Sequence, residues 1–308
     1  MEGQGGYGQW KFGEAFMYSY AISLPDRLFL DEKWQRAFCD SKIRKIEFSC
    51  SAATPREQLK QEIASLVKMQ EDGRIQVASV HIPFGADWQY HSTDETLRRQ
   101  AVENARTFMA DCGALKCSLF TVHSCVECVP LEADERAKCM EAARRSIDEL
   151  VPAAADNGIC LNIEDLPRSC LGNTAEELAQ LVEGFPYGQV GVCFDVNHFC
   201  GHPELLPEGI RLNSRRIRSF HISDYDGVDE CHWYPGMGVI DWPAIMEEIR
   251  RLPNDVLLIF ESFGFLAVEA WQKREAAPKV VLDSFVRNVF YLENAEELKR
   301  RIAVQEVK

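Results

Sequence analysis

The sequence is poor in features that direct a chain into a membrane or out of the cell. No apolar run is long enough to span a bilayer, and "MEGQGGYGQWKF" at the N-terminus has no basic segment followed by an apolar one. The formal net charge is -14, and the densest basic stretch is "RLNSRRIR" at 211–218. An acidic chain repels phosphate backbones, so we expect no nucleic acid and no membrane partner. We expect a cytoplasmic protein.

Regular cysteine spacing, internal repeats and low-complexity linkers are also missing. The 12 cysteines follow no framework, and "CVEC" at 125–128 has no second CxxC pair beside it. This favours a loop that carries cysteines over a zinc or redox site. We therefore expect free thiols in a reducing compartment and a single domain over residues 1–308.

What the sequence does contain is an alternation of short apolar runs with helical stretches. The eight runs span residues 15–23, 43–51, 74–85, 116–125, 158–166, 189–198, 216–224 and 255–264. Three helical stretches open with capping-box pairs, which are Thr54 and Glu57, Ser92 and Glu95, and Thr174 and Glu177. Eight strands with helical connections predict a closed (β/α)8 barrel. A doubly wound open sheet is the rival, weakened because no glycine-rich phosphate loop follows the first run.

Histidines and carboxylates mark the ends of six consecutive runs. They are His81, His123, Glu164, Asp195 with His198, His221 with Asp224, and Glu261, while His232 lies in the loop after the seventh run. Active sites of (β/α)8 barrels lie at the carboxyl ends of the strands. Carboxylates that converge there are costly to bury without a cation. We therefore predict one divalent metal ion, Mn²⁺ ahead of Mg²⁺, Co²⁺ or Zn²⁺, bound by Glu164, Asp195, His221 and Glu261.

These motifs resemble the sugar phosphate isomerase/epimerase-like family, part of a xylose isomerase-like superfamily of TIM barrels that also includes endonuclease IV. The matching stretches run from residue 81 to 264 and are "HIPFG", "TVHSC", "NIEDL", "CFDVNHFCGH", "FHISDYDGVDECHWYPGMGVIDW" and "FESFG". The resemblance implies the same four metal ligands, and it implies that His198 binds a substrate oxygen. As in keto-sugar 3-epimerases, Glu164 and Glu261 would move protons on opposite sides of the sugar, through a metal-stabilised enediolate.

The loop after the seventh run departs from the 3-epimerase pattern. The arginine that those enzymes carry before the "PG" turn is missing from "ISDYDGVDECHWY", and His232 is the candidate to replace it. An isomerase, a dehydratase or a lyase acting on a keto-sugar therefore stays open beside an epimerase. The remaining substrate-binding candidates are His81, His123, Asn162 and Asp224.

Three further polar residues receive weaker expectations. Glu47 ends the second run, where contact with a substrate and simple exposure to solvent are equally compatible with the sequence. His91 and His202 are expected on the surface.

Two other functions compete with the sugar enzyme. An endonuclease IV-like DNA repair enzyme would bind zinc through His81, His123, Glu164, Asp195, His198, His221, His232 and Glu261, with Glu230 where that family has an aspartate. The net charge of -14 speaks against it, because a DNA groove needs basic residues. The third possible function is that of a barrel that only binds a sugar, or of a subunit whose chemistry depends on a partner chain. The preferred partner is a small-molecule sugar, and a homo-oligomer stays open.

Overall fold

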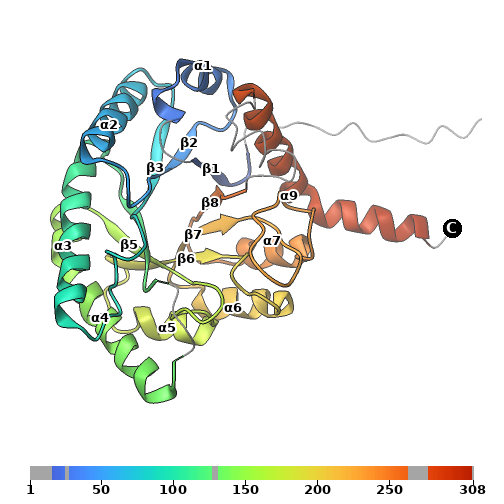
Figure 1. Cartoon of the computed structure of the whole chain (residues 1–308). Coiled ribbons are helices and arrows are strands. Elements are labelled where there is room, and N and C mark those ends of the chain that lie inside the picture. Colours follow the sequence, from blue (N-terminus) through green and yellow to red (C-terminus); the bar gives the residue numbers. More distant parts are fainter. Residues whose placement is uncertain (1–15, 25–27, 127–130, 263–276, 307–308) are drawn as a thin grey trace, which may run out of the picture.

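The protein is a closed barrel of eight parallel strands. This computed structural model describes residues 16–24, 28–126, 131–262 and 277–306. The strands pair in sequence order, and the last returns to the first (Figure 1). They are β1 (Ser19–Leu24), β2 (Lys45–Ser49), β3 (Gln76–His81), β4 (Leu119–His123), β5 (Cys160–Glu164), β6 (Val190–Asp195), β7 (Ile217–Ile222) and β8 (Leu257–Phe260). The predicted (β/α)8 barrel is confirmed, and each strand lies within its apolar run except for Leu24 at the end of β1.

Helices form the outer layer, as Figure 1 shows, and the C-terminal part of α9 projects away from the barrel. They are α1 (Glu32–Asp40), α2 (Arg56–Glu71), α3 (Glu95–Asp111), α4 (Ala133–Asp156), α5 (Ala175–Val182), α6 (Leu206–Asn213), α7 (Trp242–Arg250) and α9 (Pro278–Glu306). The sequence patterns did not pick out α1 and α6. Within the described ranges, no helix combines the length and apolar character needed to cross a bilayer.

The predicted helix caps have mixed outcomes. At α5 the N-cap half of the predicted box is confirmed, because Thr174 Oγ1 accepts a hydrogen bond from the backbone N–H of Glu177 at 3.2 Å. The Glu177 carboxylate accepts from the backbone N–H of Gly172 at 3.0 Å. At α3 the prediction is wrong, because Asp94 rather than Ser92 caps the helix and accepts from the N–H of Thr96 at 2.8 Å. At α2 the N-cap residue is Pro55 rather than the predicted Thr54, and Pro55 makes no side-chain hydrogen bond to the helix.

The barrel interior is layered along its axis. Near the amino ends of the strands, an apolar cluster is formed by Ala21, Leu257 and Ile259 with Ala78 and Leu119 packed against it. A fully buried polar layer follows, with Glu47, Ser79, Thr121, Asn162 and Ser219. Because strand side chains alternate between faces, Asn162 and Glu164 both point inward, one layer apart. The carboxyl ends therefore carry the next polar layer.

Two irregularities in strand pairing set which residues face each other. The pairing of β2 with β3 shifts just before Glu47, which then lies opposite Ser79. The pairing of β6 with β7 shifts before Cys193, and Asp195 then lies opposite His221. Bulges of this kind redirect side chains and are common near active sites.

Two expectations about single residues need correction or comment. His91 is only 7% exposed, so its assignment to the surface is wrong. The loop that holds it packs Trp88 and Tyr90 into the core and carries His91 inward with them. Of the CxxC pair, Cys125 is buried and its Sγ accepts a hydrogen bond from the backbone N–H of Leu171 at 3.1 Å, while Cys128 lies outside the described residues.

Candidate metal centre

Four side chains from four neighbouring strands converge at the carboxyl end of the barrel. Glu164 ends β5, Asp195 ends β6, His221 lies in β7 and Glu261 directly follows β8. One potential ligand atom from each lies within 4.8 Å of the other three. His221 Nδ1 is their common neighbour, at 2.8 Å from Glu164 Oε1, 3.1 Å from Glu261 Oε2 and 3.7 Å from Asp195 Oδ2.

This donor set fits a divalent cation. Asp195 is fully buried, and within the described part of the chain its Oδ2 has no hydrogen-bond partner. Three carboxylates share the space around one imidazole, and buried like charges need a compensating cation. Carboxylate and imidazole ligands together suit divalent metals such as Mn²⁺ or Zn²⁺. The four residues could therefore hold one metal ion.

The electrostatics of the cluster agree with this assignment. Burial raises the pKa of Glu164, but the charges of His221 and His123 hold it well below its usual value. Burial likewise raises the pKa of Asp195, and His198 and His221 lower it below its ordinary value. Both carboxyl groups therefore stay ionised. The negative charge that would bind a cation is present at neutral pH.

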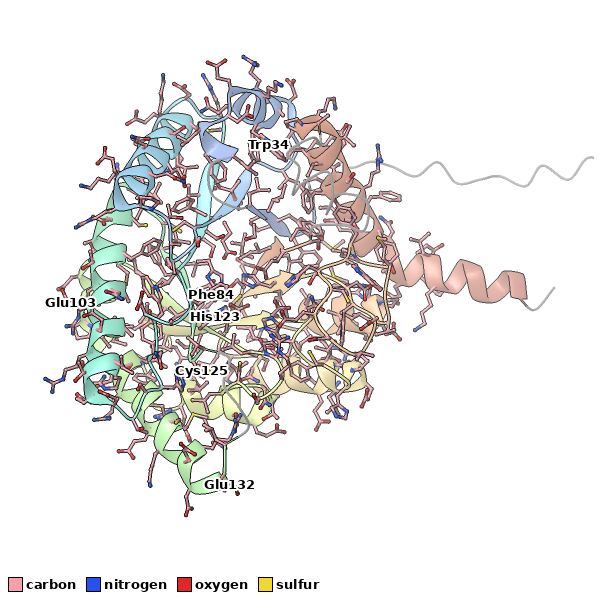
Figure 2. The ribbon with its side chains drawn as sticks, viewed as in Figure 1. Trp34, Phe84, Glu103, His123, Cys125 and Glu132 are labelled. Carbon is pink, nitrogen blue, oxygen red and sulfur yellow. The ribbon has the colours of Figure 1, made fainter. Side chains whose placement is uncertain are left out.

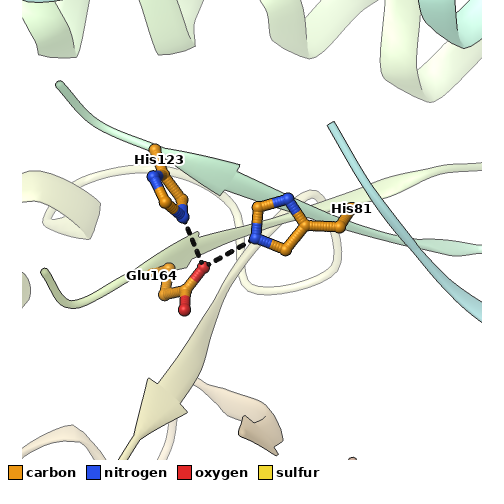
Figure 3. Close-up of side chains that lie close together, drawn as sticks. All are labelled: His81, His123 and Glu164. Atoms are coloured by element: carbon orange, nitrogen blue, oxygen red, sulfur yellow. Dashed lines mark hydrogen bonds and ion pairs between the residues drawn. The ribbon is translucent and has the colours of Figure 1, made fainter. Parts of the chain in front are cut away.

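Two further histidines contact the same carboxylate oxygen of Glu164, as Figure 3 shows. His81 Nε2 and His123 Nε2 each lie 3.1 Å from Glu164 Oε2. These three residues form a second group with the geometry to hold a metal ion, so Glu164 belongs to both groups. Burial lowers the pKa of His81, but Glu164 and Glu47 raise it to about 9. Burial lowers the pKa of His123.

An exposed aromatic ring covers His123. The rings of Phe84 and His123 stack with centroids 4.3 Å apart, and Figure 2 shows them side by side toward the barrel centre. Phe84 is 56% exposed. A large apolar side chain exposed beside a polar cluster is typical of a ligand-binding wall. Sequence reasoning missed this residue, although it lies in the "HIPFG" stretch.

His198 and His232 are both anchored through Nδ1 by a backbone carbonyl oxygen. His198 Nδ1 lies 2.6 Å from the carbonyl oxygen of Asp165, and His232 Nδ1 lies 3.0 Å from that of Glu261. Each Nε2 then faces Glu230, at 3.6 Å and 3.8 Å. Burial lowers the pKa of both histidines, but neighbouring carboxylates raise it to about 9. The structure therefore places both beside the four-residue cluster.

Asn162 lies deeper in the barrel. It is fully buried one layer below Glu164, and its Nδ2 donates to Ser219 Oγ at 3.2 Å. The structure thus places Asn162 in the barrel lining rather than in the cluster.

Asp224, also predicted to bind substrate, instead organises the loop between β7 and α7. Its two carboxylate oxygens accept hydrogen bonds at 2.8–3.2 Å from four donors, which are the backbone N–H groups of Tyr225, Gly236 and Ile240 and the indole N–H of Trp242. Gly238 packs directly against this carboxylate. A larger residue does not fit there, because a Cβ would lie 2.3 Å from Asp224 Oδ1. The Asp224 carboxylate is therefore fully engaged away from the cluster.

Two buried carboxyl groups next to the cluster were not among the predicted site residues. Asp165 Oδ1 accepts from the backbone N–H of Asp195 at 2.7 Å, and burial raises the pKa of Asp165 well above its usual value. Glu47 lies beneath the cluster and contacts His221. It is fully buried, so the alternative of an exposed Glu47 is wrong.

Comparison with known proteins places the chain in a family. The inosose isomerase of Bacillus velezensis is 24% identical over 181 residues, 55% of this chain and 62% of that protein. A D-tagatose 3-epimerase-like protein shares the fold with a TM-score of 0.70 and 19% identity, over 90% of this chain and 99% of its own. The IOLI protein with a bound zinc atom has a TM-score of 0.69 and 15% identity, over 90% and 99%. Residues 42–284 match the xylose isomerase-like TIM barrel family, to which this chain belongs.

Proposed function

We propose that this protein is a divalent-metal-dependent isomerase or epimerase that acts on a sugar or sugar phosphate. The observation that carries the proposal is the convergence of Glu164, Asp195, His221 and Glu261 within 4.8 Å at the catalytic end of the barrel. The inosose isomerase and the 3-epimerase-like protein support the substrate class. The zinc atom in the IOLI protein supports a bound metal.

The four converging residues would hold the metal, and Mn²⁺ suits their three carboxylates and one imidazole. When bound, such an ion polarises the substrate's carbonyl group and stabilises the negative charge that develops on its oxygen.

The two glutamates supply the proton transfers. One carboxylate removes the proton from the carbon next to the carbonyl group. The electron pair of the broken C–H bond forms a C=C bond, and the π electron pair of the carbonyl group moves onto its oxygen to give an enediolate. The other glutamic acid returns a proton to carbon, on the opposite face in an epimerisation. The Glu164 side chain is 1% exposed and that of Glu261 is 22% exposed. Glu261 is therefore the group that exchanges its proton with solvent.

Other residues at the mouth of the barrel orient the sugar. His198 and His232 are each held at Nδ1 by a backbone carbonyl, so Nε2 is presented to a substrate hydroxyl. The exposed ring of Phe84 offers an apolar surface to the C–H face of a sugar.

Proton exchange in heavy water tests this proposal whichever product is formed. The Mn²⁺-loaded protein is incubated in D₂O with a panel of keto-sugars and their phosphates, and proton NMR follows the C–H next to the carbonyl group. We expect this signal to disappear for the substrate class, and Glu261→Gln to slow its loss about 10²–10⁴-fold. Release of water or cleavage products would indicate a dehydratase or a lyase instead. Metal-loaded protein that leaves the whole panel unchanged would contradict the proposal.

A second candidate is an endonuclease IV-like DNA repair enzyme. It is favoured by the second group of potential ligands, His81, His123 and Glu164. The net charge of -14 opposes it. This candidate requires about three zinc ions per chain and cleavage of DNA at an abasic position.

A further inference from the structure

The imidazole of His221 lies between carboxylates on both of its edges. Nδ1 faces the cluster, with Glu164 Oε1 at 2.8 Å and Glu261 Oε2 at 3.1 Å. Nε2 faces the barrel interior, where it lies 3.2 Å from Glu47 Oε1 and 3.4 Å from Oε2. Glu47 is on β2 and His221 on β7, and these strands are not neighbours in the barrel. The contact therefore crosses the interior beneath the cluster.

Glu47 is held firmly at this depth. Its Oε2 accepts hydrogen bonds from Ser79 Oγ at 2.7 Å and from Thr121 Oγ1 at 3.3 Å. The irregular pairing of β2 with β3 places Glu47 directly opposite Ser79. Within the described residues Oε1 has no hydrogen bond, and His221 Nε2 lies 3.2 Å from it as an ion-pair partner. Both oxygens of this fully buried carboxylate therefore lie within 3.4 Å of His221 Nε2.

We propose that Glu47 is a positioning residue that fixes which nitrogen of His221 is presented to the metal, an inference that rests on the proposed metal-dependent function. Neutral imidazole carries a proton on one nitrogen and a lone pair on the other. An ionised carboxylate only accepts hydrogen bonds, so Glu47 requires the proton on Nε2. With a cation in the cluster, Glu164, Asp195 and Glu261 would bind it instead of accepting a proton from His221, so Nδ1, the nitrogen that faces them, would present its lone pair.

Glu47→Gln is an isosteric change that reverses this preference. The hydroxyls of Ser79 and Thr121 donate at the Oε2 position and would hold the amide oxygen there. The amide NH₂ group would then face Nε2 of His221 and donate to it. This favours the proton on Nδ1 and removes the lone pair from the metal side, while every metal ligand stays in place.

Calorimetric titration of Mn²⁺ into metal-free protein measures the consequence. We expect Glu47→Gln to bind Mn²⁺ about 10–100-fold more weakly than the wild type, the usual effect of losing a partner behind a ligating histidine. Glu230→Gln removes one negative charge that lies beside His198 at the mouth, and we expect a change of at most about threefold because that charge is partly exposed. Glu47→Asp keeps the charge with a shorter reach and should lie between the wild type and Glu47→Gln.

Nitrogen-15 NMR of the wild type avoids any dependence on how well a variant folds. In Zn²⁺-loaded protein with labelled histidines, we expect His221 to carry its proton on Nε2 and the metal on Nδ1. Metal bound at Nε2 would overturn this inference alone. So would a Glu47→Gln variant that thermal melting shows to be folded and that binds Mn²⁺ within about threefold of the wild-type affinity. A wild type that binds no metal would overturn the proposed function as well.

Discussion

Asp195 and Asp224 are two buried aspartates at the carboxyl side of neighbouring strands, with opposite surroundings. Loop donors engage both oxygens of Asp224. Asp195 Oδ1 accepts from the backbone N–H of Asn197 at 2.6 Å, and among the described residues Oδ2 has no such donor. A buried carboxylate with complete hydrogen bonds serves the fold, whereas one with an open oxygen beside other carboxylates is available to a cation. Hydrogen-bond completeness thus distinguishes residues that sequence position groups together.

The largest effect should come from Asp195→Asn, which separates the two aspartates most clearly. We expect Mn²⁺ affinity to fall about 10³-fold, or about 4 kcal/mol, because one of the four proposed metal ligands is lost. The metal-free variant should melt only slightly below the wild-type temperature, since the pKa of Asp195 lies below its ordinary value and its charge therefore contributes to stability at neutral pH. Titration calorimetry and thermal melting measure the two quantities, and unchanged affinity would remove Asp195 from the ligand set.

Asp224→Asn should show the reverse pattern. The amide NH₂ that replaces one carboxylate oxygen cannot accept hydrogen bonds from the N–H donors around it. We therefore expect a loss of about 3 kcal/mol in the free energy of unfolding. Mn²⁺ affinity, measured on the folded variant, should stay within about threefold of the wild type. Chemical denaturation gives the stability. A stable Asp224→Asn variant with weakened metal binding would place Asp224 in the site after all.

Stabilisation by added Mn²⁺ compares Asp195 with Asp224 in a single assay. At a free Mn²⁺ concentration of about 100 times the Kd, the wild type should gain about 2.7 kcal/mol of stability. Asp224→Asn should gain the same increment from a lower starting point, and Asp195→Asn should gain none at that concentration. Equal gains in all three proteins would indicate that the ion binds elsewhere.

Trp242→Phe offers a milder change on the Asp224 side. It removes the indole N–H that donates to Asp224 Oδ2 at 2.9 Å and leaves a smaller ring in a fully buried position. We expect a loss of about 2 kcal/mol in stability. Binding of Mn²⁺ should not change, and a measurable loss of affinity would couple this loop to the metal centre.

The strand order and the converging ends were open to prediction because they depend on local patterns. Apolar runs located all eight strands, and parallel strands in a barrel bring Glu164, Asp195, His221 and Glu261 to one end. The short helices α1 and α6 were not picked out from their apolar spacing. The choice between Ser92 and Asp94 as a helix cap depends on where the chain turns, which composition alone does not determine.

The roles of Asp224 and Glu47 were not predicted from the sequence, because they depend on contacts between distant segments. Asp224 resembles Asp195 in sequence, but donors up to 18 residues later fold back and engage its carboxylate. Glu47 lies opposite Ser79 because the pairing of β2 with β3 shifts by one residue, and no local pattern reveals such a shift. Sequence therefore located the four converging residues better than the residues that support them.

The metal content of the wild type, Asp195→Asn and Asp224→Asn, purified side by side and incubated with Mn²⁺, tests the metal centre most directly. We expect about one ion per chain in the wild type and in Asp224→Asn, and almost none in Asp195→Asn. No retained metal in the wild type, or equal content in all three proteins, would contradict the assignment of Glu164, Asp195, His221 and Glu261 as metal ligands.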